Sequence, residues 1–182
     1  MLFVLIGESG SGKSTIQKKL LENGMNKVVT YTTRPKRVDE INNIDYQFVS
    51  EKYFKYELLD KKVLLEHAVY NDWHYGYTLD GINYAEADFV LVCTPSGFEA
   101  LRKKVGTKNV MSIYFNVHER ERLMRLARRG DDIDEIFRRI VTDRIDFRGI
   151  QHSVDMVVNE REMHDLVGKL LAINKRGVKD ER

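Results

Sequence analysis

Short continuous runs of apolar residues alternate along this chain with longer segments in which apolar residues recur every three or four positions. Continuous runs of this kind are typical of strands that are buried on both faces of a parallel sheet. They cover residues 2–6, 88–93 and 110–115. The helical spacing covers about residues 13–23, 95–104, 118–129, 134–148 and 160–174. Strands that alternate with helices predict an α/β fold, in which a parallel sheet is flanked by helices.

A polar, strand-rich segment interrupts this alternation between residues 31 and 77. Ser50 is a suitable N-cap for a helix over about residues 51–59 within it. We predict a core formed by residues 1–30 and 78–182, a small insertion of residues 31–77, and a frayed tail from residue 175. Further short strands are predicted at residues 27–30, 46–49, 63–66, 73–77 and 156–158.

Composition narrows the class of protein. The chain has 182 residues, enough for one domain, and 42% of them are hydrophobic. The 30 basic and 28 acidic residues give a net charge of +2, which argues against a dedicated nucleic-acid-binding protein. No apolar stretch approaches the roughly 20 residues of a membrane span, and we expect no secretory signal before the first strand. The single Cys93 excludes an intramolecular disulfide framework and a cysteine-rich zinc site, so a cytoplasmic location is expected.

The clearest motif is a glycine-rich loop between the first predicted strand and the first predicted helix. It matches the pattern G-x-x-x-x-G-K-[ST] and consists of Gly7, Glu8, Ser9, Gly10, Ser11, Gly12, Lys13, Ser14 and Thr15. In such a loop the backbone N–H groups and the helix N-terminus surround the phosphates of a nucleoside triphosphate. The Lys13 ammonium can reach the β- and γ-phosphates, and the Ser14 hydroxyl can ligate Mg²⁺. A plain glycine-rich turn is the alternative, which the strand–loop–helix context disfavours.

A second polar loop offers a site for an anion. Arg34 and Arg37 lie three residues apart there, and two guanidinium groups can clamp an anion through paired hydrogen bonds. Tyr46, further along the loop, offers a phenol as another donor. For the two arginines alone, a solvated charged loop is the better interpretation.

The whole stretch resembles a motif of the guanylate kinase family. That motif has the form S-x-T-T-R-x-x-R-x-x-E-x-x-G-x-D-Y-x-F, and residues 30–48 follow it at nearly every position. The resemblance implies a fold of the P-loop NTPase type with a substrate-binding insertion. It also implies that Thr30 contacts the base of the acceptor and that Glu40 orients the arginines. The residues implied to bind the phosphate of GMP are Arg34, Arg37, Tyr46 and Tyr75.

The resemblance continues towards the guanine base. Glu66 and the segment from Tyr75 to Thr78 match the family's guanine-binding glutamate and its Y-G-x-x segment, with the expected spacing. A carboxylate can accept hydrogen bonds from both N1–H and the exocyclic amine of guanine, whereas adenine offers no such pair of donors. For Glu66 alone, an exposed carboxylate at the end of a strand is the alternative.

Two arginine-rich helices are predicted within residues 118–148. In isolation they fit a nucleic-acid-binding surface or a solvated helix pair. The guanylate kinase family has a lid of the form R-x-x-x-R-G, which residues 125–130 match, followed by acidic residues and a further arginine. The resemblance implies a helical lid over about residues 120–148, and an adenine contact at Asn159. The residues implied to stabilise the transferring phosphoryl group are Lys13, Arg37, Arg125, Arg129 and Arg139, with Arg138 as the alternative to Arg139.

The chain departs from the family at three positions. The strand before Pro95 usually ends in an acidic D-x-D-like element, and here Thr94 is a weaker substitute for its contact with the base. Magnesium would then rest on Ser14, the ATP phosphates and water. Tyr77 replaces a small hydroxylic residue near the base. Asn43 replaces a loop glycine, and asparagine tolerates a left-handed backbone.

These observations together predict an enzyme that transfers the γ-phosphoryl group of ATP to GMP or dGMP with Mg²⁺. A related P-loop kinase with another deoxynucleotide or a sugar phosphate as acceptor is the main alternative. A non-catalytic binding module of the same fold fits the intact phosphate loop less well, and a nucleic-acid-binding protein is a third alternative. We expect nucleotides as partners, no membrane association, and a monomer or homodimer.

Overall fold

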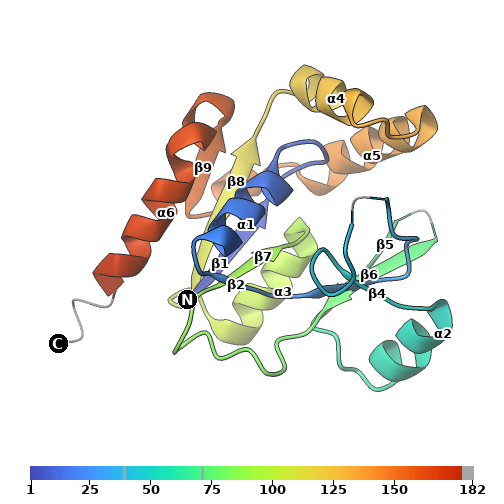
Figure 1. The fold of residues 1–182 in the computed structure, drawn as a ribbon, viewed down its shortest axis with the longest axis horizontal. Helices are drawn as coiled ribbons and strands as arrows, with labels where there is room; N and C mark the ends of the chain where they lie inside the picture. Colours follow the sequence, from blue (N-terminus) through green and yellow to red (C-terminus); the bar gives the residue numbers. More distant parts are fainter. Residues whose placement is uncertain (39, 71, 178–182) are drawn as a thin grey trace.

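A parallel five-stranded sheet in the order β2-β7-β1-β8-β9 forms the centre of the protein (Figure 1). The structure is a computed structural model and describes residues 1–38, 40–70 and 72–177. In chain order the five strands are β1 (Leu2–Ile6), β2 (Asn26–Lys27), β7 (Phe89–Val92), β8 (Val110–Asn116) and β9 (Met156–Asn159). The predicted α/β fold with a parallel sheet is therefore confirmed.

Helices cover both faces of this sheet, because its central strand is apolar on both sides. Alternate residues of β1 belong to two separate hydrophobic clusters, with Val4 in one and Leu5 in the other. The cluster around Leu5 includes side chains from α1 (Lys13–Glu22) and α6 (Met163–Gly177), and the cluster around Val4 includes side chains from α3 (Pro95–Val105). Accordingly, α1 and α6 pack on one face and α3 packs on the other (Figure 1).

Two further helices form a hairpin that follows β8. These are α4 (Glu119–Arg128) and α5 (Ile133–Asp146), and a small hydrophobic cluster with Leu126 and Ile140 lies between them. The hairpin spans the residues for which a lid was predicted. Two 3₁₀ turns, η2 (Ile150–His152) and η3 (Glu160–Glu162), lie before and after β9.

A second sheet, in the order β4-β3-β6-β5, lies beside the core (Figure 1). Its strands are β3 (Thr30–Thr32), β4 (Gln47–Phe48), β5 (Glu66–Tyr70) and β6 (Trp73–Tyr77). β3 pairs in parallel with β4 and antiparallel with β6, and β5 and β6 form a hairpin. Between β4 and β5 the chain forms α2 (Glu51–Tyr53) and the π-helix η1 (Phe54–Leu59). The Ser50 side chain accepts a hydrogen bond from Tyr53 N–H, which confirms the predicted N-cap.

Two predicted strands have different bounds in the structure. The strand predicted at residues 27–30 is divided, because Lys27 pairs with β7 in the core sheet whereas Thr30 pairs with Tyr77 in the small sheet. The strand predicted at residues 63–66 begins only at Glu66, where pairing with β6 starts. Just before it, the Leu65 N–H donates to the backbone oxygen of Tyr77 (2.8 Å), and the Leu65 side chain packs against the hydrophobic cluster of the core.

Three smaller predictions can also be compared with the structure. Asn43 has a φ of 64°, so the left-handed backbone expected there is confirmed. α6 continues to Gly177, so the tail predicted to fray from residue 175 is helical at its start, and residues 178–182 lie outside the described residues. Among the described residues, no helix is long and apolar enough to cross a membrane. The cytoplasmic location stays a prediction.

Candidate active site

The glycine-rich loop joins the carboxyl end of β1 to the N-terminus of α1, as predicted. Gly10 and Gly12 have φ values of 78° and 96°, which residues with a Cβ rarely adopt. A Cβ on Gly10 would also lie 2.7 Å from the backbone oxygen of Arg122 in α4. The loop therefore needs glycine both for its backbone conformation and for its close approach to the lid hairpin.

Lys13 turns back over this loop. Its Nζ donates hydrogen bonds to the backbone oxygens of Gly7 (2.5 Å) and Glu8 (2.9 Å) and to the Ser11 hydroxyl (3.2 Å). Burial lowers the pKa of Lys13 to about 8, against the opposing effect of the nearby carboxylates of Asp143 and Glu8. The ammonium is thus held inside the loop by neutral acceptors. The charged oxygens of a phosphate would accept stronger hydrogen bonds from it than these carbonyl groups do.

The residues around Ser14 suit a magnesium ion that is held mainly by phosphate and water. Ser14 is exposed in the first turn of α1, and its hydroxyl makes no hydrogen bond to the described residues. No group of three or more histidine, cysteine or acidic residues able to hold a metal occurs in the described part of the chain. A single hydroxyl fits Mg²⁺, because this ion usually keeps several waters and takes its other ligands from substrate phosphates.

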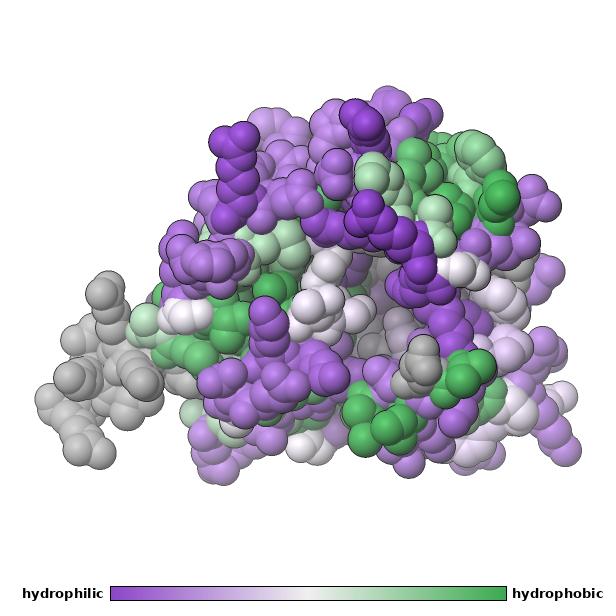
Figure 2. Space-filling model, turned by 45° about the horizontal axis from the view of Figure 1, so that its top comes forward, coloured by the Kyte–Doolittle hydropathy of each residue, from purple (hydrophilic) through white to green (hydrophobic). Residues whose placement is uncertain are grey.

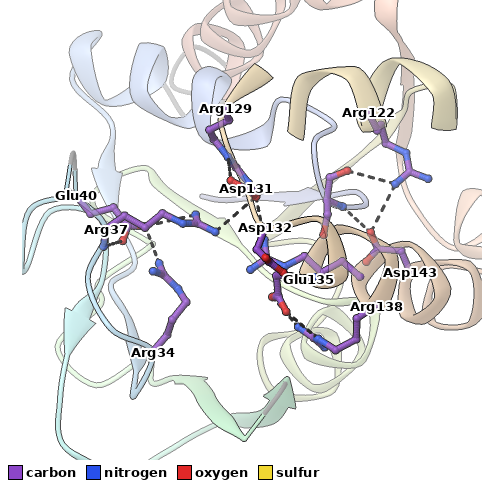
Figure 3. Close-up of polar contacts among 12 residues, drawn as sticks. Arg34, Arg37, Glu40, Arg122, Arg129, Asp131, Asp132, Glu135, Arg138 and Asp143 are labelled. Atoms are coloured by element: carbon purple, nitrogen blue, oxygen red, sulfur yellow. Dashed lines mark hydrogen bonds and ion pairs between the residues drawn. The ribbon is translucent and has the colours of Figure 1, made fainter. Parts of the chain in front are cut away.

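An acidic residue that the sequence does not predict for the site contacts the same loop. Asp143, in α5, accepts a hydrogen bond from Ser9 N–H (2.7 Å), and its carboxylate lies 3.6 Å from Nη1 of Arg122 (Figure 3). Burial raises the pKa of Asp143, and the Ser9 N–H and the charge of Lys13 oppose this effect. A sequence signal exists, because Asp143 follows Arg139 by one helical turn and so shares its helix face.

The polar loop of the insertion positions its two arginines through one glutamate. Glu40 accepts hydrogen bonds from Arg34 Nη2 (2.6 Å) and from Arg37 N–H (2.8 Å). Arg34 is 5% exposed, and its guanidinium lies 5.6 Å from the ring centroids of Tyr46 and Phe48. This arrangement supports the orienting role predicted for Glu40, because the arginine is fixed by a charged partner and by two rings.

The insertion and the lid meet at Asp131, in the turn between α4 and α5 (Figure 3). Its carboxylate is paired with Arg129 of the same turn and lies 3.8 Å from both Arg37 and Arg139. Burial raises the pKa of Asp131, but the hydrogen bond and the charges of these arginines outweigh it and leave the pKa below its usual value. Three of the predicted catalytic arginines thus converge on one anion.

Glu66 lies at the other end of the site, against the N-terminus of α3. Its Oε1 accepts hydrogen bonds from the hydroxyls of Thr94 and Ser96, the latter at 3.1 Å. A Cβ on Gly97 would lie only 2.1 Å from Glu66 Oε2, so glycine makes room for the carboxylate. Burial raises the pKa of Glu66, while the hydroxyls oppose the shift. Tyr77, at the end of β6, is buried, and its hydroxyl donates to the backbone oxygen of Gly97 at 2.7 Å.

One pocket combines residues from the phosphate loop, the small sheet, the end of β7 and α5. Figure 2 shows the hollow between the lid hairpin and the small sheet. The predicted site residues in its lining are Gly7, Ser9, Lys13, Thr30, Arg34, Arg37, Tyr46, Glu66, Tyr75, Thr94 and Arg139. Residues in the lining that were not predicted for the site include Tyr70, Thr142 and Asp143, and Arg138 lines it beside Arg139.

The other predicted residues are not among those that line this pocket. They are Glu8, Gly10, Ser11, Gly12, Ser14, Thr15, Glu40, Thr78, Arg125, Arg129 and Asn159. Thr78 is engaged in a turn, where its hydroxyl accepts from Asp80 N–H at 3.1 Å. Arg125 donates to the backbone oxygen of Ser11 (3.4 Å) and pairs with Glu160, the residue after Asn159. Arg125 and Asn159 are therefore brought together on the side of the loop that faces α6.

Comparison with known proteins agrees with this geometry. The family model described as guanylate kinase matches residues 1–175. A guanylate kinase of Wolbachia pipientis wMel is 34% identical over 174 residues, which cover 88% of this chain and 86% of the relative. One of Neisseria gonorrhoeae is 32% identical over 180 residues, 94% of this chain and 85% of the relative. The crystal structure of guanylate kinase from Anaplasma phagocytophilum superposes with a TM-score of 0.69 at 22% identity, covering 97% of this chain and 85% of that one. This chain therefore belongs to the guanylate kinase family of enzymes.

Proposed function

We propose that this enzyme transfers the γ-phosphoryl group of ATP to GMP and dGMP. The observation that carries the proposal is that Lys13 of the phosphate loop and Glu66 line the same pocket, with Arg34, Arg37 and Arg139 also in its lining. A nucleoside monophosphate can then direct its base towards Glu66 and its phosphate towards the arginines. That orientation points the acceptor phosphate at the phosphate loop, where ATP would bind.

The recognition of guanine rests on the Glu66 carboxylate. Thr94 and Ser96 both donate to Oε1, so Oε2 faces fewer side-chain donors and the group is held in one orientation. Guanine offers two adjacent donors to such a carboxylate, whereas adenine presents an acceptor at N1. Burial raises the pKa of Glu66, while the hydrogen bonds from Thr94 and Ser96 favour the ionised form that this role requires.

The transfer itself needs no nucleophile or general base from the protein. The acceptor phosphate is already an anion, so positioning and stabilisation of charge supply the rate. Lys13, Arg37, Arg129 and Arg139 would neutralise charge on the transferring group. The Ser14 hydroxyl would hold Mg²⁺ together with phosphate oxygens, and this ion would supply further charge neutralisation at the β- and γ-phosphates.

The arrangement of the lid arginines disfavours the nucleic-acid-binding alternative. Most of them are paired with acidic side chains of the same chain: Arg122, Arg125, Arg129, Arg138, Arg139 and Arg144 all take part in ion pairs. A surface that binds a polyanion would instead offer cations without such partners. The intact phosphate loop also disfavours a non-catalytic module.

An ADP-release assay against a panel of monophosphates tests the proposal. We expect turnover with GMP and dGMP and little with AMP, CMP, UMP or sugar phosphates, and we expect Lys13→Ala to abolish it while the protein stays folded. Faster turnover of another acceptor would overturn the GMP assignment but not phosphoryl transfer. Absence of turnover with every acceptor, or full activity of a folded Lys13→Ala variant, would overturn the enzymatic proposal itself.

A further inference from the structure

The outer face of α5 carries an apolar stripe that the proposed function does not use. Its four members lie four residues apart and are 68%, 64%, 56% and 66% exposed: Ile133, Phe137, Val141 and Ile145. Figure 2 shows hydrophobic residues gathered over the α4–α5 hairpin. Large contiguous patches of exposed apolar residues are uncommon on monomeric proteins and mark sites of interaction.

The stripe is separate from the nucleotide pocket. Arg138, Arg139 and Asp143 line the pocket, whereas Ile136 and Ile140 pack against α4. At 100° per residue, the stripe is centred on the side of α5 opposite the pocket-lining residues. A partner bound to the stripe would therefore leave the pocket accessible, and neither the pocket nor the lid core explains why these positions are apolar.

The order of residues along the stripe is symmetric under reversal of the helix. On this outer face, positions equally spaced on either side of residue 139 pair an apolar residue with an apolar one and an acidic residue with a basic one. Ile133 corresponds to Ile145, and Phe137 corresponds to Val141. Between them, the acidic Asp134 corresponds to the basic Arg144 and lies on the same outer face.

We propose that a second copy of this chain covers the stripe, with the two α5 helices packed antiparallel about a two-fold axis beside residue 139. In such an isologous interface each contact occurs twice, so one helix must be complementary to its own reverse. Ile133 then meets Ile145 of the second copy, Phe137 meets Val141, and Asp134 meets Arg144. Ridges of residues four apart pack into each other in the commonest class of helix crossing.

Charge favours the antiparallel arrangement over a parallel one. Among the described residues, Asp134 has no ion-pair partner, and Arg144 is paired with Glu119 through Nε and Nη2. Antiparallel packing gives Asp134 a cation from the second copy, whereas parallel packing would set Asp134 against its own counterpart. One helix pair buries less than the roughly 1,200–2,000 Å² of a standard stable interface, so we infer a dimer that depends on concentration.

Sedimentation velocity from about 1 to 200 μM tests whether the protein dimerises, a range chosen to span a weak dissociation constant. We expect a monomer–dimer equilibrium, and Phe137→Asp should raise the dissociation constant by about 30-fold or more, as for a central interface residue. Tyr56→Asp, at an aromatic residue of η1 that is 51% exposed, is the matched control and should leave dimerisation unchanged. Turnover per protomer of Phe137→Asp should equal that of the wild type at low concentration.

Single-cysteine variants test the direction of packing. The native Cys93 is buried, so it should not compete in cross-linking. A mixture of Ile133→Cys and Ile145→Cys should form a disulfide-linked dimer under mild oxidation, whereas Ile133→Cys alone should not. A protein that stays monomeric, a dimer insensitive to Phe137→Asp, or self-cross-linking of Ile133→Cys would overturn the proposal. A monomer that sediments with zwitterionic lipid vesicles would overturn it in favour of a lipid surface.

Discussion

The Glu66 carboxylate is oriented by residues at the N-terminus of α3. Thr94 caps α3 by accepting from Gly97 N–H (3.0 Å), and the Thr94 and Ser96 hydroxyls both donate to Glu66. The chain thus has a threonine at position 94, where the family usually has an acidic residue, and this threonine orients the Glu66 carboxylate of β5. In the proposed complex with GMP, position 94 would offer the base no anionic contact, so recognition would depend more on Glu66.

We expect Glu66→Gln to reduce kcat/KM for GMP by about 10- to 150-fold, because a hydrogen bond to a charged group contributes about 1.5–3 kcal/mol. The amide would turn one acceptor into a donor that faces a donor of guanine. Steady-state kinetics with GMP and IMP at saturating ATP measure the effect, and the KM for ATP should change little. IMP lacks the exocyclic amine, so it should lose less; equal losses for both would show that Glu66 does not bind that amine.

Gly97→Ala provides a second variant that moves the carboxylate without changing it. The added Cβ would lie 2.1 Å from Glu66 Oε2, so the side chain must shift. The KM for GMP should then rise while that for ATP stays constant. Gly168→Ala in α6, where a Cβ meets nothing within 4 Å, is the matched control and should behave as the wild type.

The affinity for ATP should depend on pH through Lys13. Burial lowers the pKa of its ammonium to about 8 in the free protein, and a bound triphosphate would raise this pKa. The protein should therefore bind ATP with its full affinity below pH 8, where Lys13 is charged before binding. Above pH 8 the affinity for ATP should fall by up to about tenfold per pH unit, until the pH reaches the pKa of Lys13 in the complex. Isothermal titration calorimetry in buffers of different ionisation enthalpy should detect proton uptake at pH 9. Lys13→Arg keeps its charge and should show none; a wild type that takes up no proton would contradict the assignment.

At the scale of elements, the strongly periodic segments could be predicted and the short polar ones could not. Leu2–Ile6 and the helices α1 and α3 follow from apolar spacing and capping residues alone. The start of β3 could not be predicted in this way, because Lys27 and Thr30 belong to different sheets and only the tertiary pairing separates them. The apolar residues before Glu66 predicted a longer strand, whereas the Leu65 side chain packs on the core and β5 begins at Glu66.

The candidate site divides in the same way. Lys13 could be predicted from a local motif, and Arg34 and Glu66 from the resemblance of short stretches of the chain to the guanylate kinase family; all three line the pocket. Asp143 and Asp131 could not, since their roles depend on α5 and the lid turn folding back over the phosphate loop and the insertion. Acidic residues in an arginine-rich hairpin look like ordinary solvated charges until the tertiary contacts are known.

The lid turn offers a test at this scale, because the arginines that Asp131 contacts are those proposed to bind the phosphoryl groups. Its carboxylate lies among Arg37, Arg129 and Arg139, which would also meet a phosphoryl group. We expect Asp131→Asn to strengthen GMP binding in the absence of ATP by about 2- to 12-fold, the equivalent of one net hydrogen bond of about 0.5–1.5 kcal/mol. Asp134→Asn removes the same charge from an exposed position and should leave the affinity unchanged. Weaker GMP binding by Asp131→Asn would instead identify Asp131 as a residue that positions the arginines.

The whole molecule brings two peripheral segments over one end of the core sheet. Arg37 of the insertion lies 3.8 Å from Asp131 of the lid, and the Tyr70 hydroxyl donates to Asp146 at 3.5 Å. Phosphoryl transfer to a nucleotide competes with transfer to water, so the site must exclude water when both substrates are bound. We propose that the insertion (residues 31–77) and the lid (residues 120–148) move as units to do this.

We expect the distance between these units to shorten when GMP and a non-hydrolysable ATP analogue are bound together, because each phosphate draws arginines from both segments. Spin labels at Tyr56→Cys and Met124→Cys would report the separation by pulsed electron resonance, since both side chains are exposed and the native Cys93 is buried. Labels at Lys18→Cys and Lys108→Cys, two exposed positions of the core, are the control and should keep a constant distance. Either nucleotide alone should give an intermediate distribution, because it engages only part of the arginine set. An unchanged separation in the ternary complex would overturn the proposal that the insertion and the lid close over the bound nucleotides.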